Sequence, residues 1–164
     1  MSNKEIQALA ESLGQYLKKN ECYLTTAESC TGGGLAYAIT AIPGSSTWFD
    51  RGFITYSNFS KQTILDIPED ALKKYGAVSQ ETVLLMAQNA LEKSIADIGL
   101  SITGIAGPTG GTSEKPVGTV YFGIAQKSMP PQATKQQFTG NRESIRQQSI
   151  QFCLHWVNQI LYLK

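Results

Sequence analysis

The sequence predicts one α/β domain, a three-layer α/β/α sandwich around a mixed, mainly parallel sheet of about five strands. Short β-rich runs alternate with helical patterns along the 164 residues, which is typical of layered α/β folds. Glycine-rich turns follow two of these runs, and a polar connection joins the last two, which favours an antiparallel pair within the sheet. The length fits a single domain, so we expect residues 1–164 to form one unit.

The first half of the chain is expected to begin with a helix over residues 3–19, because apolar residues recur there at helical spacing. This apolar stripe consists of Ile6, Leu9, Ala10, Leu13 and Leu17. Pro43-Gly44 is expected to end a second helix. The elements expected after the first helix are a strand at 22–27, a helix at 35–42, a strand at 52–57 and short helical stretches after Lys61 and Pro68.

In the second half, Ser79 is a good N-cap for a helix over residues 80–93. Val120, Phe122 and Ile124 lie on one face of a predicted strand. The strands expected here span 98–103, 117–125 and 134–138, and a long final helix is expected to start after Thr139-Gly140-Asn141 and to reach about Leu161.

Composition excludes several classes of protein. The net charge of +1 and the 16% of charged residues argue against a nucleic-acid-binding protein. No apolar run is long enough for a membrane span, and the N-terminus lacks a signal-peptide pattern. Three scattered cysteines (Cys22, Cys30, Cys153) predict no disulfide framework and, with one histidine, no zinc site. We therefore expect a cytoplasmic protein, in which a magnesium site on carboxylates stays open although no paired acidic motif indicates one.

One candidate site is the turn of residues 28–34, Glu-Ser-Cys-Thr-Gly-Gly-Gly, which follows the first predicted strand. Ligands of open α/β folds bind at the carboxyl ends of strands, and glycines let a ligand approach the backbone amides there. Ser29 or Cys30 would be an exposed nucleophile in such a turn. Alternatively, Ser29 or Thr31 only caps the next helix.

A second glycine-rich loop, residues 104–111, follows Thr103 at the end of another predicted strand. Seven of the fifteen glycines fall in these two turns (residues 32, 33, 34, 104, 107, 110 and 111). Neither turn has a known phosphate-binding signature. If the two strands are neighbours, both turns border one pocket.

A serine nucleophile needs a base, and the only histidine, His155, lies among apolar residues of the last helix, which argues against a Ser-His-Asp triad. Lys61 follows the end of the second strand. A partly buried lysine with a lowered pKa can act as the base, but taken alone Lys61 is expected to be a solvated surface residue. Tyr56 is likewise expected to be an ordinary strand aromatic.

Arg142 is one of three arginines and lies at the predicted N-terminus of the last helix. A cation there opposes the helix dipole by roughly 0.3–1 kcal/mol, unless an anionic ligand binds between the guanidinium and the helix amides. The alternatives are that Arg142 points into solvent or pairs with Glu143.

Taken together, these motifs resemble the CinA C-terminal domain family, whose stand-alone members include a bacterial nicotinamide mononucleotide deamidase. The segments that carry the resemblance are TTAESCTGG (25–33), PGSS (43–46), FDRGFITYSNFSKQ (49–62), GAVSQET (76–82), SITGIAGPTGGTSEKPVGTVYFGIA (101–125) and FTGNRESIR (138–146). They occur in order over most of residues 25–146. Asn141 stands where we expect aspartate in many relatives.

The resemblance implies a three-layer α/β/α fold, an amidohydrolase that needs no metal or cofactor, and a homodimer or higher homo-oligomer. It implies that the nicotinamide carboxamide of the mononucleotide is hydrolysed to nicotinate mononucleotide and ammonia, within pyridine nucleotide salvage. Ser29 would be the nucleophile, Lys61 the base and Tyr56 an assisting group. Substrate-binding residues are expected at Glu28, Cys30, Thr31, Gly32, Gly33, Thr103, Gly104, Ala106, Gly107 and Arg142.

Two other functions stay open at this point. The chain could be a catalytically silent nucleotide-binding module with the same fold, or an amidase for another nucleotide. Cys30 also stays open as an alternative nucleophile.

Overall fold

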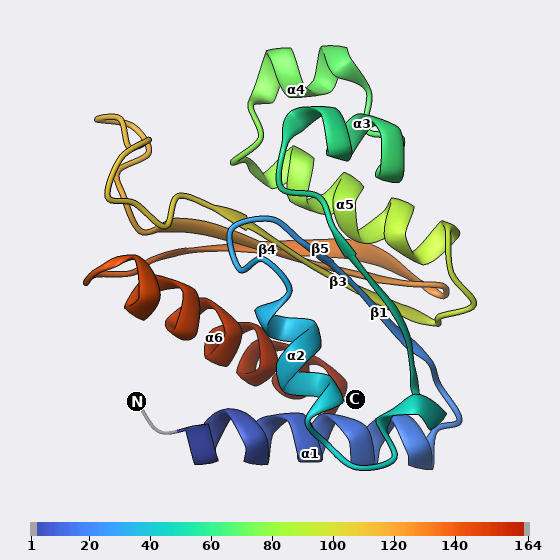
Figure 1. The fold of residues 1–164 in the computed structure, drawn as a ribbon. Coiled ribbons are helices and arrows are strands. Elements are labelled where there is room, and N and C mark those ends of the chain that lie inside the picture. Colours follow the sequence, from blue (N-terminus) through green and yellow to red (C-terminus); the bar gives the residue numbers. More distant parts are fainter. Residues whose placement is uncertain (1–2, 163–164) are drawn as a thin grey trace.

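The computed structural model describes residues 3–162 and, within that range, contains one five-stranded sheet with helices on both faces (Figure 1). The α-helices are α1 (Asn3–Lys19), α2 (Gly34–Thr40), α3 (Asn58–Leu65), α4 (Glu69–Tyr75), α5 (Gln80–Glu92) and α6 (Arg142–Tyr162). The strands are β1 (Leu24–Glu28), β2 (Phe49–Ile54), β3 (Ile98–Gly104), β4 (Thr119–Gln126) and β5 (Met129–Gln137). A short 3₁₀ helix, η1, spans Ser45–Thr47.

The strands lie in the order β2-β1-β3-β4-β5. β1 pairs in parallel with both β2 and β3, whereas β4 pairs antiparallel with β3 and β5. Four strands therefore run in one direction and only β4 is reversed, which confirms the prediction of a mixed sheet. Because β1, β2 and β3 are parallel, the segments that follow them all emerge at the same edge of the sheet.

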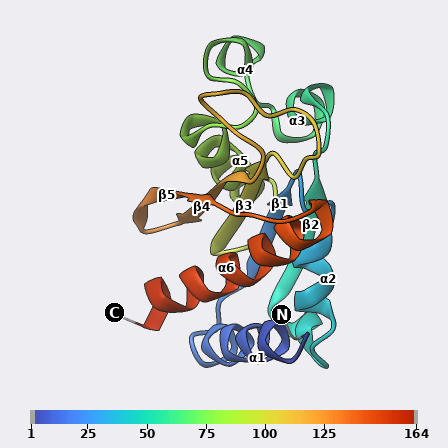
Figure 2. The same cartoon turned by 90° about the vertical axis from the view of Figure 1, so that its left-hand side faces the viewer.

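The sheet separates two helical layers (Figure 2). One layer consists of α3, α4 and α5, and α5 packs on β3 and β4; the other consists of α1, α2 and α6. The larger core cluster joins that second layer to the sheet and includes Leu13, Leu17, Leu100, Phe122 and Leu154. A smaller cluster under α3–α5 consists of Ala27, Leu65, Ile67, Leu72, Met86 and Ala90. Within residues 3–162, no helix is long and apolar enough to cross a membrane.

Two expected strands differ from the structure. β2 ends at Ile54, so Tyr56 lies in a loop and not in a strand. The chain leaves the strand here because Ser57 caps α3, with its hydroxyl accepting from the Ser60 amide in a reciprocal capping box. β5 begins at Met129, earlier than expected. Its two prolines, Pro130 and Pro131, are tolerated because β5 is an edge strand.

Candidate active site

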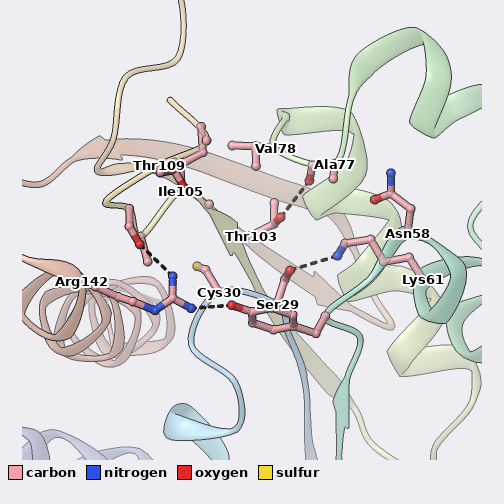
Figure 3. A pocket seen from close by; sticks show the side chains of 15 residues that line it. Ser29, Cys30, Asn58, Lys61, Ala77, Val78, Thr103, Ile105, Thr109 and Arg142 are labelled. Atoms are coloured by element: carbon pink, nitrogen blue, oxygen red, sulfur yellow. Dashed lines mark hydrogen bonds between the residues drawn. The ribbon is translucent and has the colours of Figure 1, made fainter. Parts of the chain in front are cut away.

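The segments that follow β1, β2 and β3 surround a cavity of about 260 Å³ at the carboxyl edge of the parallel strands (Figure 3). The start of α6 and the segment between α4 and α5 complete its walls. The lining residues are Ser29, Cys30, Tyr56, Asn58, Lys61, Ala77, Val78, Thr103–Gly107, Thr109, Gly110 and Arg142.

Ser29 and Lys61 meet inside this cavity (Figure 3). Nζ of Lys61 lies 2.9 Å from Oγ of Ser29 and donates a second hydrogen bond of 2.7 Å to the carbonyl oxygen of Thr55. The Lys61 side chain is 1% exposed and Ser29 is 8% exposed. The expectation of a solvated surface lysine is therefore wrong. Lys61 lies on the same face of α3 as the buried Leu65 one turn later, and this face packs toward the sheet.

Burial lowers the pKa of the Lys61 ammonium from 10.5 to about 8, because the charged form loses its hydration inside the protein. No carboxylate offsets this effect, since none of the ion pairs among residues 3–162 includes Lys61. Once neutral, Nζ can accept the hydroxyl proton of Ser29 while one of its hydrogens still donates to Thr55. The arrangement can therefore move a proton between Ser29 and Lys61 near neutral pH.

Residues 29–33, which we call the nucleophile turn, connect β1 to α2. Ser29 accepts a hydrogen bond from the Gly32 amide at 3.0 Å, and Thr31 accepts one from the Gly34 amide at 3.1 Å. Gly32 and Gly33 have φ angles of +58° and +93°, a region that strongly favours glycine. Among the described residues, no other residue accepts from the Cys30 or Thr31 amide. Of these two residues only Cys30 lines the cavity, because Thr31 is buried behind it. The Cys30 N–H group is therefore the one available to an oxyanion beside Ser29.

Glu28 does not contribute to the cavity, so its expected role in substrate binding needs correction. Its carboxylate is 1% exposed and accepts from the amides of Gly33 (3.2 Å), Leu35 (2.9 Å) and Ala36 (2.8 Å). These are the amides that a helix start leaves without partners, so Glu28 caps α2. The alternative that Ser29 or Thr31 caps this helix is wrong, because the N-cap is Gly33, which has no side chain to do so.

Cys30 lines the cavity beside Ser29. Burial raises the pKa of its thiol to about 12, and the nearby Glu28 carboxylate acts in the same direction. Because the thiolate is the reactive form of cysteine, this environment disfavours Cys30 as the nucleophile.

Arg142 bridges two walls of the cavity. Its Nη1 donates to the carbonyl oxygen of Gly107 at 2.9 Å, and its Nη2 donates to the hydroxyl of Tyr56 (Figure 3). In the described part of the chain Arg142 has no ion pair with Glu143 or any other acid. Opposite these groups, the buried hydroxyl of Thr103 donates to the Ala77 carbonyl at 2.8 Å and fixes the segment between α4 and α5.

The side chains that line the cavity give it a positive charge. Lys61 and Arg142 line it without a paired carboxylate, and Arg146 reaches the nucleophile turn from the next turn of α6. Within residues 3–162 no three acidic, histidine or cysteine side chains gather in a way that could hold a metal ion. Such a site is suited to a ligand that carries an anionic group.

The family model described as the CinA C-terminal domain matches residues 6–161. The chain belongs to the CinA C-terminal domain family. It is 51% identical over 154 residues to a nicotinamide-nucleotide amidohydrolase PncC of Enterobacter agglomerans, covering 94% of both chains. The protein of the same name from Escherichia coli strain K12 is 46% identical over 154 residues, which cover 94% of this chain and 93% of that one.

Solved CinA structures share this fold. The crystal structure of the competence/damage inducible protein CihA from Agrobacterium tumefaciens superimposes with a TM-score of 0.92 at 37% identity and covers 96% of each chain. The CinA C-terminal domain described above therefore has the same arrangement of sheet and helices as an experimentally determined relative.

In this CinA domain, nine of the thirteen expected site residues line the cavity: Ser29, Cys30, Tyr56, Lys61, Thr103, Gly104, Ala106, Gly107 and Arg142. Glu28, Thr31, Gly32 and Gly33 lie behind it and shape the nucleophile turn. Sequence reasoning did not single out Asn58, Ala77 or Val78, although they fall within the segments YSN and GAV that carried the resemblance. It also assigned no role to Arg146.

Proposed function

We propose that this protein hydrolyses the carboxamide of nicotinamide mononucleotide to nicotinate mononucleotide and ammonia, with Ser29 as nucleophile and Lys61 as base. The observation that carries the proposal is the buried contact of 2.9 Å between Lys61 and Ser29, together with the lowered pKa of Lys61. Two relatives at 51% and 46% identity are named nicotinamide-nucleotide amidohydrolases. Residues 1–164 would act as one amidohydrolase domain.

In the first step, neutral Lys61 takes the proton of Ser29 while Oγ attacks the carboxamide carbon. The oxyanion is stabilised by the Cys30 amide at the wall of the cavity. Lys61 then gives its proton to the departing amine, the C–N bond breaks and ammonia leaves the acyl-enzyme. Water attacks the ester and Lys61 takes a proton from that water. The C–O bond to Ser29 then breaks, Lys61 gives this proton to Oγ to restore the serine hydroxyl, and the product leaves as the carboxylate.

The substrate phosphate is proposed to bind Arg142 and the loop of residues 104–111. Two guanidinium donors of Arg142 already contact Gly107 and Tyr56, which holds the group in place, and the remaining N–H groups are available for phosphate oxygens. The Tyr56 hydroxyl accepts from Arg142 and can donate its own hydrogen to the substrate. This gives Tyr56 an assisting role at the mouth of the cavity.

The test is ammonia release from nicotinamide mononucleotide and from its dephosphorylated riboside, with the unaltered chain and Ser29→Ala. We expect turnover of the nucleotide, much slower turnover of the riboside, and loss of activity in Ser29→Ala by a factor of at least about 10³. Ser128→Ala, an exposed serine of the β4–β5 turn, is the matched control.

Each alternative function predicts a different result. Tight nucleotide binding without ammonia release would indicate a silent binding module, and ammonia only from another nucleotide would indicate a different amidase. Equal rates with the riboside would contradict the phosphate site, and full activity of Ser29→Ala would exclude Ser29 as the nucleophile.

The biological setting stays a prediction. Hydrolysis of this amide fits pyridine nucleotide salvage, and the free thiols of Cys22, Cys30 and Cys153 support a reducing, cytoplasmic location. A homodimer or higher homo-oligomer is still predicted. The large apolar side chains exposed on this chain, which include Tyr37, Ile54 and Phe59, are suited to such contacts.

A further inference from the structure

Arg146 lies on α6, one helical turn after Arg142, and reaches the back of the nucleophile turn. Its Nη2 donates to the carbonyl oxygen of Thr31 at 2.9 Å. A Cβ atom placed on Gly32 would come within 3.4 Å of the same nitrogen. The guanidinium therefore packs directly against the part of the turn that contains glycine.

The charge of Arg146 has no acidic partner among residues 3–162. The residue is half-buried, and its Nε is buried without a hydrogen-bond partner. A buried charge is normally paired, so a half-buried unpaired arginine is costly for stability. That cost is offset if the guanidinium serves the site next to it.

The nucleophile turn needs an external support because its glycines give it little rigidity of its own. Glu28 fixes the helix side of the turn through the amides of Gly33, Leu35 and Ala36. Arg146 fixes the opposite side, since the Thr31 carbonyl accepts both from Arg146 and from the Gly34 amide. Both lone pairs of this oxygen are then occupied, which prevents the Thr31–Gly32 peptide from rotating.

We propose that Arg146 is a positioning residue that holds the nucleophile turn so that Ser29 and the Cys30 amide keep their positions at the wall of the cavity. It acts through the backbone of Thr31 and does not line the cavity. This inference rests on the proposed function because it assumes the proposed reaction. The contacts of Arg146 with Thr31 and Gly32 are independent of that assumption.

The test compares Arg146→Met and Arg146→Lys with the unaltered chain. For nicotinamide mononucleotide we expect kcat of Arg146→Met to fall by about 10–100-fold with KM changed less than about twofold, because the lost interaction matters only in the transition state. Lysine retains a charge and a donor and restores part of kcat. Added millimolar guanidinium ion restores part of kcat in Arg146→Ala. Arg51→Met, an exposed arginine of β2, is the matched control.

A second readout does not depend on the substrate. Phenylmethanesulfonyl fluoride labels an activated serine: the bond from Ser29 Oγ to sulfur forms, the S–F bond breaks, fluoride leaves and Lys61 takes the hydroxyl proton. Mass spectrometry of the labelled peptide gives the rate at Ser29. We expect this rate to fall in Arg146→Met in parallel with kcat, and to keep the same pH midpoint because Lys61 is unaffected.

Three outcomes would overturn the proposal: kcat and the labelling rate both within about twofold of the unaltered chain, a loss confined to KM, or a shifted pH midpoint. If Arg146→Met is inactive only because it unfolds, then the folded Arg146→Lys should show no loss and guanidinium should not restore the activity of Arg146→Ala. That combination of results also overturns the proposal. If the unaltered chain releases no ammonia, the proposed function fails, while the labelling rates still decide the role of Arg146.

Discussion

The lowered pKa of Lys61 predicts how the reaction rate depends on pH. A shift from 10.5 to about 8 corresponds to about 3 kcal/mol between the charged and neutral forms of the side chain. With this pKa, the neutral fraction is about 9% at pH 7, about 50% at pH 8 and about 90% at pH 9. An unshifted lysine would be only about 0.03% neutral at pH 7.

Because the base must be neutral to take the Ser29 proton, kcat/KM should rise with pH and level off above the pKa. We expect an increase of about tenfold between pH 7 and pH 9. The phosphate of the substrate, whose second pKa is about 6, is already mostly dianionic throughout this range and leaves the profile unchanged.

The assay is the initial rate of nicotinate mononucleotide formation, quantified by chromatography so that no coupling enzyme responds to pH. A rate that stays constant between pH 7 and pH 9, or that rises only near pH 10, would refute a buried neutral Lys61 as the base. Lys61→Arg is the decisive variant, because it keeps a cation that does not lose its proton in this range. It should be inactive at every pH in the series.

Two further predictions concern stability. Lys61 binds fewer protons in the folded than in the unfolded chain between pH 8 and pH 10.5, so its burial penalises folding below pH 8 and the penalty disappears as pH rises. In urea titrations, the free energy of unfolding of the native chain, measured relative to that of Lys61→Met, should therefore increase by about 1 kcal/mol from pH 7 to pH 9. A difference between the two proteins that does not change with pH would contradict this. Glu28→Gln should lower the free energy of unfolding by about 2–3 kcal/mol, because an amide cannot accept from all three helix amides. Exposed Glu114→Gln should change it by less than about 0.5 kcal/mol, and equal effects of both would be the contrary result.

The sequence was sufficient for the elements whose pattern is local. The apolar stripe predicted α1 at its observed bounds, and Ser79 indeed accepts from the Thr82 amide at the start of α5. β2 was placed too late because Thr55 and Tyr56 favour a strand as much as Phe53 does. Pairing with β1 and the capping of α3 by Ser57 decide where the strand ends, and the first of these depends on a distant segment.

The site residues also divide into those that local sequence predicts and those that depend on contacts with distant segments. The position of Ser29 on a strand-end turn follows from neighbouring residues, whereas the burial of Lys61 depends on a contact across 32 positions of the chain. Composition alone therefore predicts a surface lysine. Glu28 was misassigned because its partners are the amides of Leu35 and Ala36, which no side-chain pattern reveals. Arg146 contacts Thr31 across 115 positions of the chain, so this contact is visible only in three dimensions.

The reversed strand β4 has a consequence for how this site can change during evolution. It makes the segment between β3 and β4 a hairpin loop, closed at its neck where Ile105 exchanges backbone hydrogen bonds with Gly118 and Thr119. Beyond that neck, insertions or deletions alter one wall of the cavity without moving β1 or β2, which are followed by the segments that contain Ser29 and Lys61. Ser29 and Lys61 thus follow parallel strands, whereas the loop of residues 104–111 belongs to a hairpin whose length and sequence can change independently of them.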